Sequence, residues 1–356
     1  MYLKTLPFNK TLFKKDFNMV KILAFTIAAI LFVSITVCLL SRPYSLRNIE
    51  KYYIEEGIEY NRDDLIEGYK DEINWRLTNE EAIVSLLLLA PIVLVAILFG
   101  EEKRMKTFEV LSVMPYRKYE IFFNKLLVAL LAMALPFVIN GAIMILALGV
   151  SPSLRMFYSA KQILIWIFSN VYYQLPILSF SLIFGAITGT TISQVILTAI
   201  FLVFPIGFPL LIGYNLELWG LLGSSSIWIR FGRIFDKILE YSLMGVFDSS
   251  CQGPKHYIIF ILLSMGMIII AKILFDKNKI ERNRETLEFE KTEGFFKFGV
   301  SICTALLIAV IFSWIFESFI SIFDTFQAFI ILIGYAVGGT LGYFIANYSI
   351  KFNRSK

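Results

Sequence analysis

Eight long apolar stretches constrain this chain more than any other feature of its sequence. Each is close to the ~20 residues that an α-helix needs to cross the hydrocarbon core of a bilayer. They run from Ile22 to Leu40, Ala82 to Phe99, Leu126 to Val150, Gln162 to Ile187, Ile192 to Gly213, Tyr257 to Phe275, Phe298 to Phe316 and Phe326 to Ile350. A polar turn at 188–191 separates the fourth stretch from the fifth, because one helix from 162 to 213 would be about 78 Å long. The pattern predicts an all-α fold, a polytopic membrane helix bundle with about eight transmembrane helices.

The composition excludes most other classes of protein. Apolar residues other than Gly make up 57% of the 356 residues and charged residues only 17%, whereas ordinary globular chains have about 25% charged residues. A soluble globular protein, a disordered chain and a disulfide scaffold are therefore excluded. The three Cys and the single His show no disulfide framework and no metal-ligand spacing.

The distribution of Lys and Arg predicts the orientation in the membrane. If the N-terminus is cytoplasmic, the inner segments sum to a charge of +10 and the outer segments to −5. Lys and Arg are enriched in cytoplasmic loops, so we expect both termini in the cytoplasm. These segments contain every charged residue of the chain, so no ionisable group is expected in the middle of a span. We therefore expect neither an enzyme nor an ion-coupled transporter, and neither a cofactor nor a nucleic-acid partner.

Three segments outside the spans have distinct patterns. Residues 1–21 place apolar side chains and lysines on different faces, which predicts an amphipathic interfacial helix, although a simple positive-inside anchor gives the same charges. Residues 41–81 form an acidic outer loop, to which we assign no role. The outer loop 214–256 is predicted to hold an interfacial or re-entrant helix, either a gate for a substrate exit or a lid over the bundle. Its apolar stripe consists of Ile227, Phe231, Ile234, Phe235, Ile238, Leu239 and Leu243.

Segment 100–125, between the second and third predicted spans, has the most informative pattern. Glu101 to Met114 has helical periodicity, Pro115 ends that helix because a proline ring does not fit into a helix interior, and Tyr119 to Lys125 begins the next span. The pattern predicts a short amphipathic helix on the cytoplasmic face. Such a helix can dock into a groove on a soluble partner. A surface loop that only supplies positive charge fits the spacing equally well.

Small residues recur at four-residue spacing near two span ends, a pattern that lets helices approach closely. They are Gly185 and Gly189, and, in the last span, Gly334, Gly338 and Gly342. The spacing leaves open whether they pack within one chain or between two chains.

Segment 100–125 also resembles the first cytoplasmic loop of ABC-2 type transporter permeases. That loop carries a Glu, a Gly-Thr pair, a second Glu, a Leu, a Pro, an Arg and a Lys that enters the next span. The matching residues are Glu102, Thr107, Glu109, Leu111, Pro115, Arg117 and Lys125, while Lys106 stands where the family has Gly. The N-terminal segment is similar to the elbow helix of that family. The charged segment before the last two spans is similar to a subgroup with extra C-terminal spans.

The resemblance implies a permease subunit that has no nucleotide site. Such a subunit pairs with a cytoplasmic ATP-binding subunit and with a second permease chain in the plasma membrane, surrounded by lipid. It implies a coupling element formed by Glu101, Glu102, Thr107, Glu109, Leu111, Pro115, Arg117 and Lys125. The organisation it implies is an interfacial helix (1–21), a six-span core (22–275), a charged linker (276–297), a two-span hairpin (298–350) and a cytoplasmic tail (351–356).

Two classes of function remain open. The first is a permease that exports a hydrophobic or amphipathic substrate, such as a peptide, a lipid or a drug-like molecule, with energy from a separate ATPase. The second is a non-transporting membrane scaffold or sensor. A secondary transporter is disfavoured, since such proteins keep ionisable groups inside the membrane for ion coupling.

Overall fold

The computed structural model describes residues 8–79, 81–102, 116–221, 225–247, 254–277, 291–316 and 327–352. Every regular element in these residues is a helix, which confirms the predicted all-α fold. The chain divides into two compact units. Unit 1 contains residues 1–98 and 115–179, and unit 2 contains residues 99–114 and 180–356.

Unit 1 begins with one continuous helical stretch of 46 residues, Lys10–Glu55. It consists of α1 (Lys10–Leu31), a π-helical turn η1 (Phe32–Thr36) and α2 (Val37–Glu55). The predicted separate interfacial helix over 1–21 is not seen in the described residues, because 10–21 are the first turns of α1. The reason is that one buried face continues through the boundary expected between residues 21 and 22. Its buried residues are Leu12, Asp16, Val20, Ala24, Ile27, Ala28 and Leu31.

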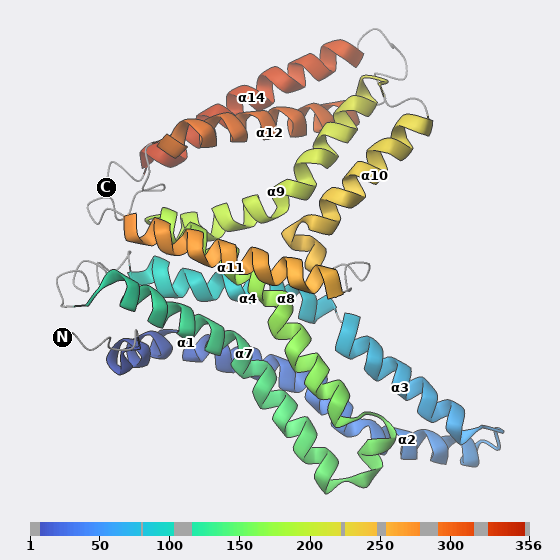
Figure 1. The fold of residues 1–356 in the computed structure, drawn as a ribbon. Coiled ribbons are helices and arrows are strands. Elements are labelled where there is room, and N and C mark those ends of the chain that lie inside the picture. The colour runs from blue at the N-terminus through green and yellow to red at the C-terminus, as the bar shows by residue number, and fades with distance from the viewer. Residues whose placement is uncertain are drawn as a thin grey trace. The chain divides into compact units, whose positions relative to one another are not determined.

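Residues 41–79 of the predicted acidic loop form a helical hairpin. After α2 the chain turns back into α3 (Arg62–Asn79), and the two helices lie side by side (Figure 1). Arg42 Nη2 donates to Glu72 Oε1 at 2.6 Å, and the Arg42 guanidinium lies 5.3 Å from the centre of the Tyr69 ring. The hairpin is thus joined by a charge pair near its base.

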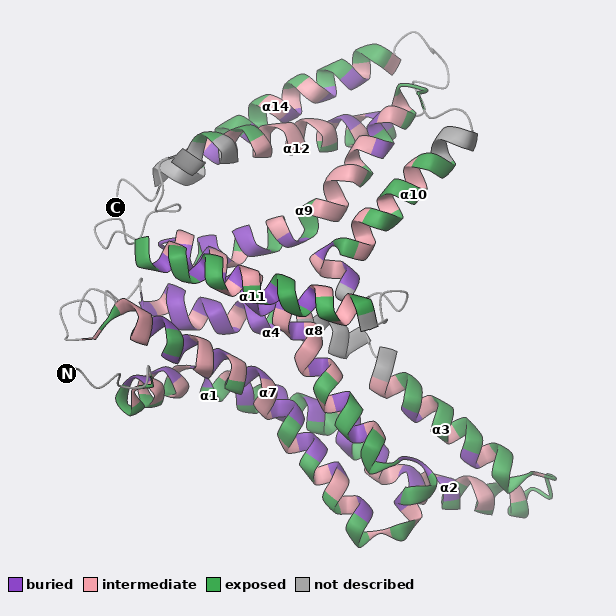
Figure 2. Ribbon diagram, viewed as in Figure 1, coloured by how far each residue is buried: buried purple, intermediate pink, exposed green. Residues whose placement is uncertain are grey.

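The rest of unit 1 consists of α4 (Glu81–Val95), the first residues of the π-helical turn η2 (Ala96–Glu101), α7 (Lys118–Val150), a 3₁₀ turn η3 (Pro152–Met156) and most of α8 (Ala160–Ile187). α7 packs along α1, and Figure 2 shows buried residues along both helices. These helices form the interior of unit 1.

Unit 2 contains α9 (Thr191–Leu218), α10 (Ser225–Tyr241), a 3₁₀ turn η4 (Leu243–Phe247), α11 (Pro254–Lys277), α12 (Lys291–Ile315) and α14 (Gln327–Phe352). The turn between α8 and α9 is where the sequence predicts it, and Thr190 caps α9 by accepting a hydrogen bond from the Ser193 N–H at 3.2 Å. α10 is the helix predicted within loop 214–256, and α12 and α14 form a long pair (Figure 1).

Within the described residues, seven helices are long and apolar enough to cross a membrane, against eight predicted. They are Lys10–Glu55, Lys118–Val150, Ala160–Ile187, Thr191–Leu218, Lys255–Lys277, Lys297–Ile315 and Gln327–Tyr348. The remaining predicted span, Ala82 to Phe99, is helical as α4 and η2. Its apolar helix covers only Leu88–Glu101 among the residues searched, which is shorter than a bilayer span.

Candidate functional site

The predicted coupling segment, 100–125, is described at both ends. Glu101, Glu102, Arg117 and Lys125 lie in the described residues. The other four predicted coupling residues, Thr107, Glu109, Leu111 and Pro115, lie outside them. Contacts can therefore be described for the first residues and the last residues of this segment.

In unit 1, the end of the segment is fixed by a buried lysine. Lys125 Nζ donates to the backbone carbonyl of Leu98 at 2.6 Å and lies 3.5 Å from Asp16 Oδ1. The side chains of Lys125 and Asp16 are only 1% and 2% exposed. Lys15 Nζ also lies 3.6 Å from Asp16 Oδ1, so this carboxylate faces two ammonium groups. We call Asp16, Lys125 and the Leu98 carbonyl the lysine cluster.

Two asparagines support the lysine cluster. Asn9 caps α1 by accepting hydrogen bonds from the Thr11 and Leu12 N–H groups. The Asn9 N–H donates to Asn124 Oδ1 at 3.1 Å, and Asn124 Nδ2 donates to the Glu120 carbonyl at 2.7 Å. The first turn of α1 is therefore tied to the first turns of α7, next to Lys125.

Arg117 and Glu120 define the beginning of α7. Arg117 is the N-cap residue, and its backbone N–H donates to Glu120 Oε2 at 3.4 Å. A carboxylate in the first turn is favoured by the partial positive charge of a helix N-terminus. The Arg117 residue is exposed, which leaves its guanidinium accessible to a partner.

In unit 2, the start of the segment packs against the start of α9. Thr191 Oγ1 donates to Glu101 Oε1 at 3.2 Å. A Cβ atom on Gly100 would lie 2.7 Å from Thr191 Cα, so only glycine fits at this contact. The Phe99 ring meets the Phe275 ring edge to face at 5.8 Å, and Glu102 is 1% exposed. The residues before 103 are thus held by side chains of α9 and α11.

The lysine cluster brings the two ends of the segment together. Leu98 precedes the segment and Lys125 is its last residue, and one hydrogen bond joins them. The Leu98 carbonyl lies in η2, and π-helical turns inside helices are frequent at functional sites.

Sequence reasoning missed the lysine cluster, although it named Lys125. It counted Asp16 and Lys125 as solvated cytoplasmic charges, whereas both are buried between helices. One signal was present. Asp16 is the only acidic residue among 1–21, and it falls at four-residue spacing with the apolar face of α1.

Of the glycines predicted to mediate helix packing, one set lies at a helix–helix contact and the other pair does not share a helix. Gly334, Gly338 and Gly342 are buried on the face of α14 that meets α12. A Cβ on Gly338 would lie 2.5 Å from the Thr304 carbonyl oxygen and 2.8 Å from Ala305 Cα. Gly185 and Gly189 do not share a helix, because α8 ends at Ile187.

Among the described residues, no group of three or more His, Cys, Asp or Glu side chains lies close enough together to hold a metal ion. No protein-family model matches the chain, and no curated protein or solved structure is significantly similar to it. Its assignment to a function therefore depends on the sequence pattern and on the geometry at the lysine cluster.

Proposed function

We propose that this chain is the transmembrane permease subunit of an ABC-2 type transporter in a plasma membrane. In this proposal it has eight spans with both termini in the cytoplasm, and α4 with η2 forms the second span. A separate cytoplasmic ATP-binding subunit hydrolyses ATP, and a second permease chain completes the transport path. The substrate is hydrophobic or amphipathic and is exported.

The observation that carries the proposal is the bond between Lys125 Nζ and the Leu98 carbonyl. It supports a loop whose two ends are locked to each other and, through Asp16, to α1. In this proposal the ATPase binds the predicted helix between Glu101 and Met114. Because Lys125 links the residues on either side of that helix to α1, movement of the ATPase would displace α1 and α7 together.

The described residues around the segment also support a docking role. Arg117 is exposed at the cap of α7, whereas Glu101 is held by Thr191. In this proposal Arg117 and Glu109 contact the ATPase, while Glu101 and Lys125 position the loop. The two groups of residues predict different phenotypes, because contacts affect partner binding and positioning residues affect the fold.

Affinity purification from mild detergent tests the proposal. We expect a soluble protein with a P-loop to co-purify in stoichiometric amount and to be lost with the Arg117→Glu variant. The matched control is Lys70→Glu, an exposed charge reversal on α3, which should retain the ATPase. A wild-type preparation without any ATPase, under conditions that preserve other membrane complexes, would contradict the proposal and favour the scaffold or sensor.

A further inference from the structure

We propose that α10 binds the phosphate of an anionic phospholipid through Arg230, Arg233 and Lys237. This proposal does not depend on the proposed function. It rests on the spacing of the three cations, on the absence of a carboxylate within ion-pair distance of them among the described residues, and on the contact of α10 with a helix long and apolar enough to span a membrane.

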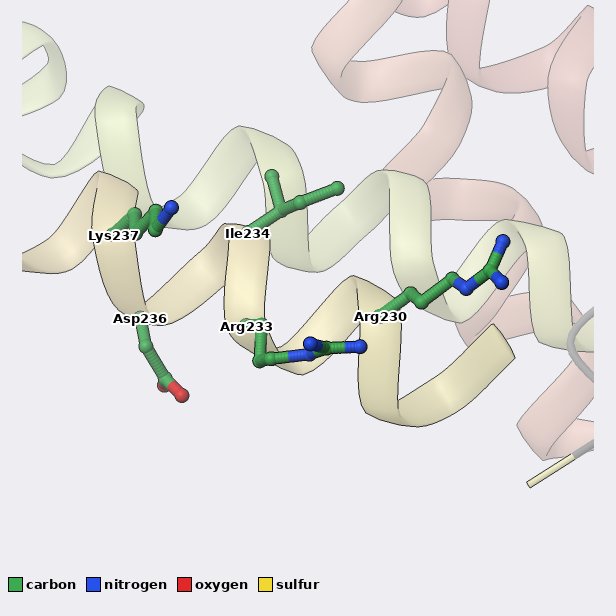
Figure 3. Close-up of a pocket in the computed structure, with 5 residues that line it drawn as sticks. All are labelled: Arg230, Arg233, Ile234, Asp236 and Lys237. Carbon is green, nitrogen blue, oxygen red and sulfur yellow. The ribbon is translucent and has the colours of Figure 1, made fainter. Parts of the chain in front are cut away.

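The three cations lie on one side of α10. Their spacing of three and four residues places them on one face of a helix, and all three residues are exposed. Together with Ile234 and Asp236 they line an open groove of about 460 Å³. Figure 3 shows the Arg230 and Arg233 side chains extending in the same direction along the helix, whereas Asp236 points to the other side from Lys237 and Ile234.

Positive charge exceeds negative charge on this face within the described part of the chain, because Asp236 is the one carboxylate that lines the groove with the three cations. No carboxylate there lies within ion-pair distance of Arg230, Arg233 or Lys237. The nearest acid along α10 after Asp236 is Glu240, which contacts His256 Nε2 at 2.8 Å. The Arg230 and Arg233 guanidinium groups extend the same way along the helix and match a phosphate, because guanidinium donors bind phosphate oxygens in pairs. The Lys237 ammonium, one turn further along α10, adds positive charge to the same groove.

The attachment of α10 favours a lipid over a free anion. The Phe231 ring covers Gly213 of α9, where a Cβ atom would lie 2.6 Å from Phe231 Cε1. The opposite side of α10 is therefore turned away from α9, which is itself apolar enough to span a membrane. Ile229 and Ile234, 61% and 59% exposed, lie beside the cations. An exposed face with both aliphatic and cationic side chains is typical of helices at the lipid headgroup level.

The test measures lipid binding to the full-length protein by native mass spectrometry in detergent micelles. Phosphatidylglycerol is titrated against phosphatidylcholine for the wild type and for a triple variant, Arg230→Gln with Arg233→Gln and Lys237→Gln. Each cation near a lipid headgroup contributes about fivefold in affinity. We therefore expect phosphatidylglycerol binding to weaken about a hundredfold in the triple variant. Phosphatidylcholine binding should weaken much less, because the choline cation of the same headgroup already offsets the charge of its phosphate.

A second triple variant controls for net charge. Arg47→Gln with Lys51→Gln and Lys70→Gln removes three exposed cations from the α2–α3 hairpin and should bind phosphatidylglycerol like the wild type. The single variant Arg233→Gln, which changes one exposed side chain, should weaken binding about fivefold. Unchanged phosphatidylglycerol binding in the α10 variants would overturn the proposal. Binding of inorganic phosphate as tight as that of phosphatidylglycerol would overturn the choice of a lipid.

Discussion

The α1–α7 pair of unit 1 and the α12–α14 pair of unit 2 are held together by opposite means. Between α1 and α7, buried polar groups meet. Lys125 faces Asp16, and Asn140 Nδ2 donates a hydrogen bond to the Ala28 carbonyl at 3.0 Å. Between α12 and α14, three glycines on one helix face allow the two backbones to touch. Of the residues in the apolar part of α7, 44% are buried, against 11% for α12.

The difference follows from how helices associate in lipid. Lipid tails are as apolar as leucine, so helices associate through close packing and hydrogen bonds rather than by excluding water. A pair with few buried side chains needs close backbone contact, and glycine supplies it. A pair buried inside a unit can use polar groups, provided that they are paired. We therefore expect side-chain chemistry to control the first pair and side-chain volume the second.

The largest expected effect is from Lys125→Met. This change leaves the volume similar but removes the ammonium group from a buried carboxylate, and breaking one side of a buried ion pair costs about 3–5 kcal/mol. The midpoint of thermal unfolding in detergent should fall well below that of the wild type. The double variant Asp16→Asn with Lys125→Met should recover part of the loss, because no buried charge is then left without a partner. A single variant as stable as the wild type would contradict the cluster's role.

The next effect separates two adjacent glycines of α14. Gly338→Ala places a methyl group against the backbone of α12 and should destabilise the pair by about 1–3 kcal/mol, the cost of overpacking. Gly339→Ala meets only Ala305 Cβ at 3.8 Å. It should be neutral or stabilising, because alanine has the higher helix propensity. Equal unfolding midpoints for the two variants would show that backbone contact does not hold α12 and α14 together.

A moderate effect is expected at Asn140. Its Nδ2 group donates to the carbonyls of Ala28 and Pro136 at 3.0 and 2.8 Å, in addition to the bond from Thr36. Asn140→Leu should lower stability by about 1–2 kcal/mol, since it removes the interhelical bonds and leaves Thr36 Oγ1 without its acceptor. Thr36→Val removes one bond and should cost less. Thermal unfolding of both variants measures this order, and the reverse order would contradict it.

The smallest effect tests whether polar contacts also matter in unit 2. Tyr335 of α14 donates its hydroxyl hydrogen to Asn215 Oδ1 at 2.8 Å and accepts from Trp219 Nε1 at 3.1 Å. Tyr335→Phe keeps the ring and should cost only about 0.5–1.5 kcal/mol. If its unfolding midpoint fell as far as that of Gly338→Ala, this polar contact between α14 and α9 would stabilise unit 2 as much as the backbone contact between α12 and α14, which would contradict the account.

The sequence predicts the helices well because bilayer thickness dictates their length. Four-residue spacing likewise places Gly334, Gly338 and Gly342 on one helix face. The lysine cluster was not predictable, because Asp16 and Lys125 are far apart in the chain and become neighbours only when α1 packs on α7. The first helix begins earlier than predicted. Lysines on its other faces make residues 10–21 look like a surface segment, although Leu12 and Asp16 belong to the buried face of α1.

ATP hydrolysis by the purified complex tests the central claim most directly. Under the proposed function this chain should stimulate a partner ATPase, and Glu109→Lys or Arg117→Glu should abolish the stimulation while membrane insertion stays intact. Lys70→Glu, the matched charge reversal on α3, should hydrolyse ATP like the wild type. If the Arg117→Glu and Glu109→Lys complexes hydrolyse ATP at the wild-type rate, segment 100–125 does not couple this chain to an ATPase.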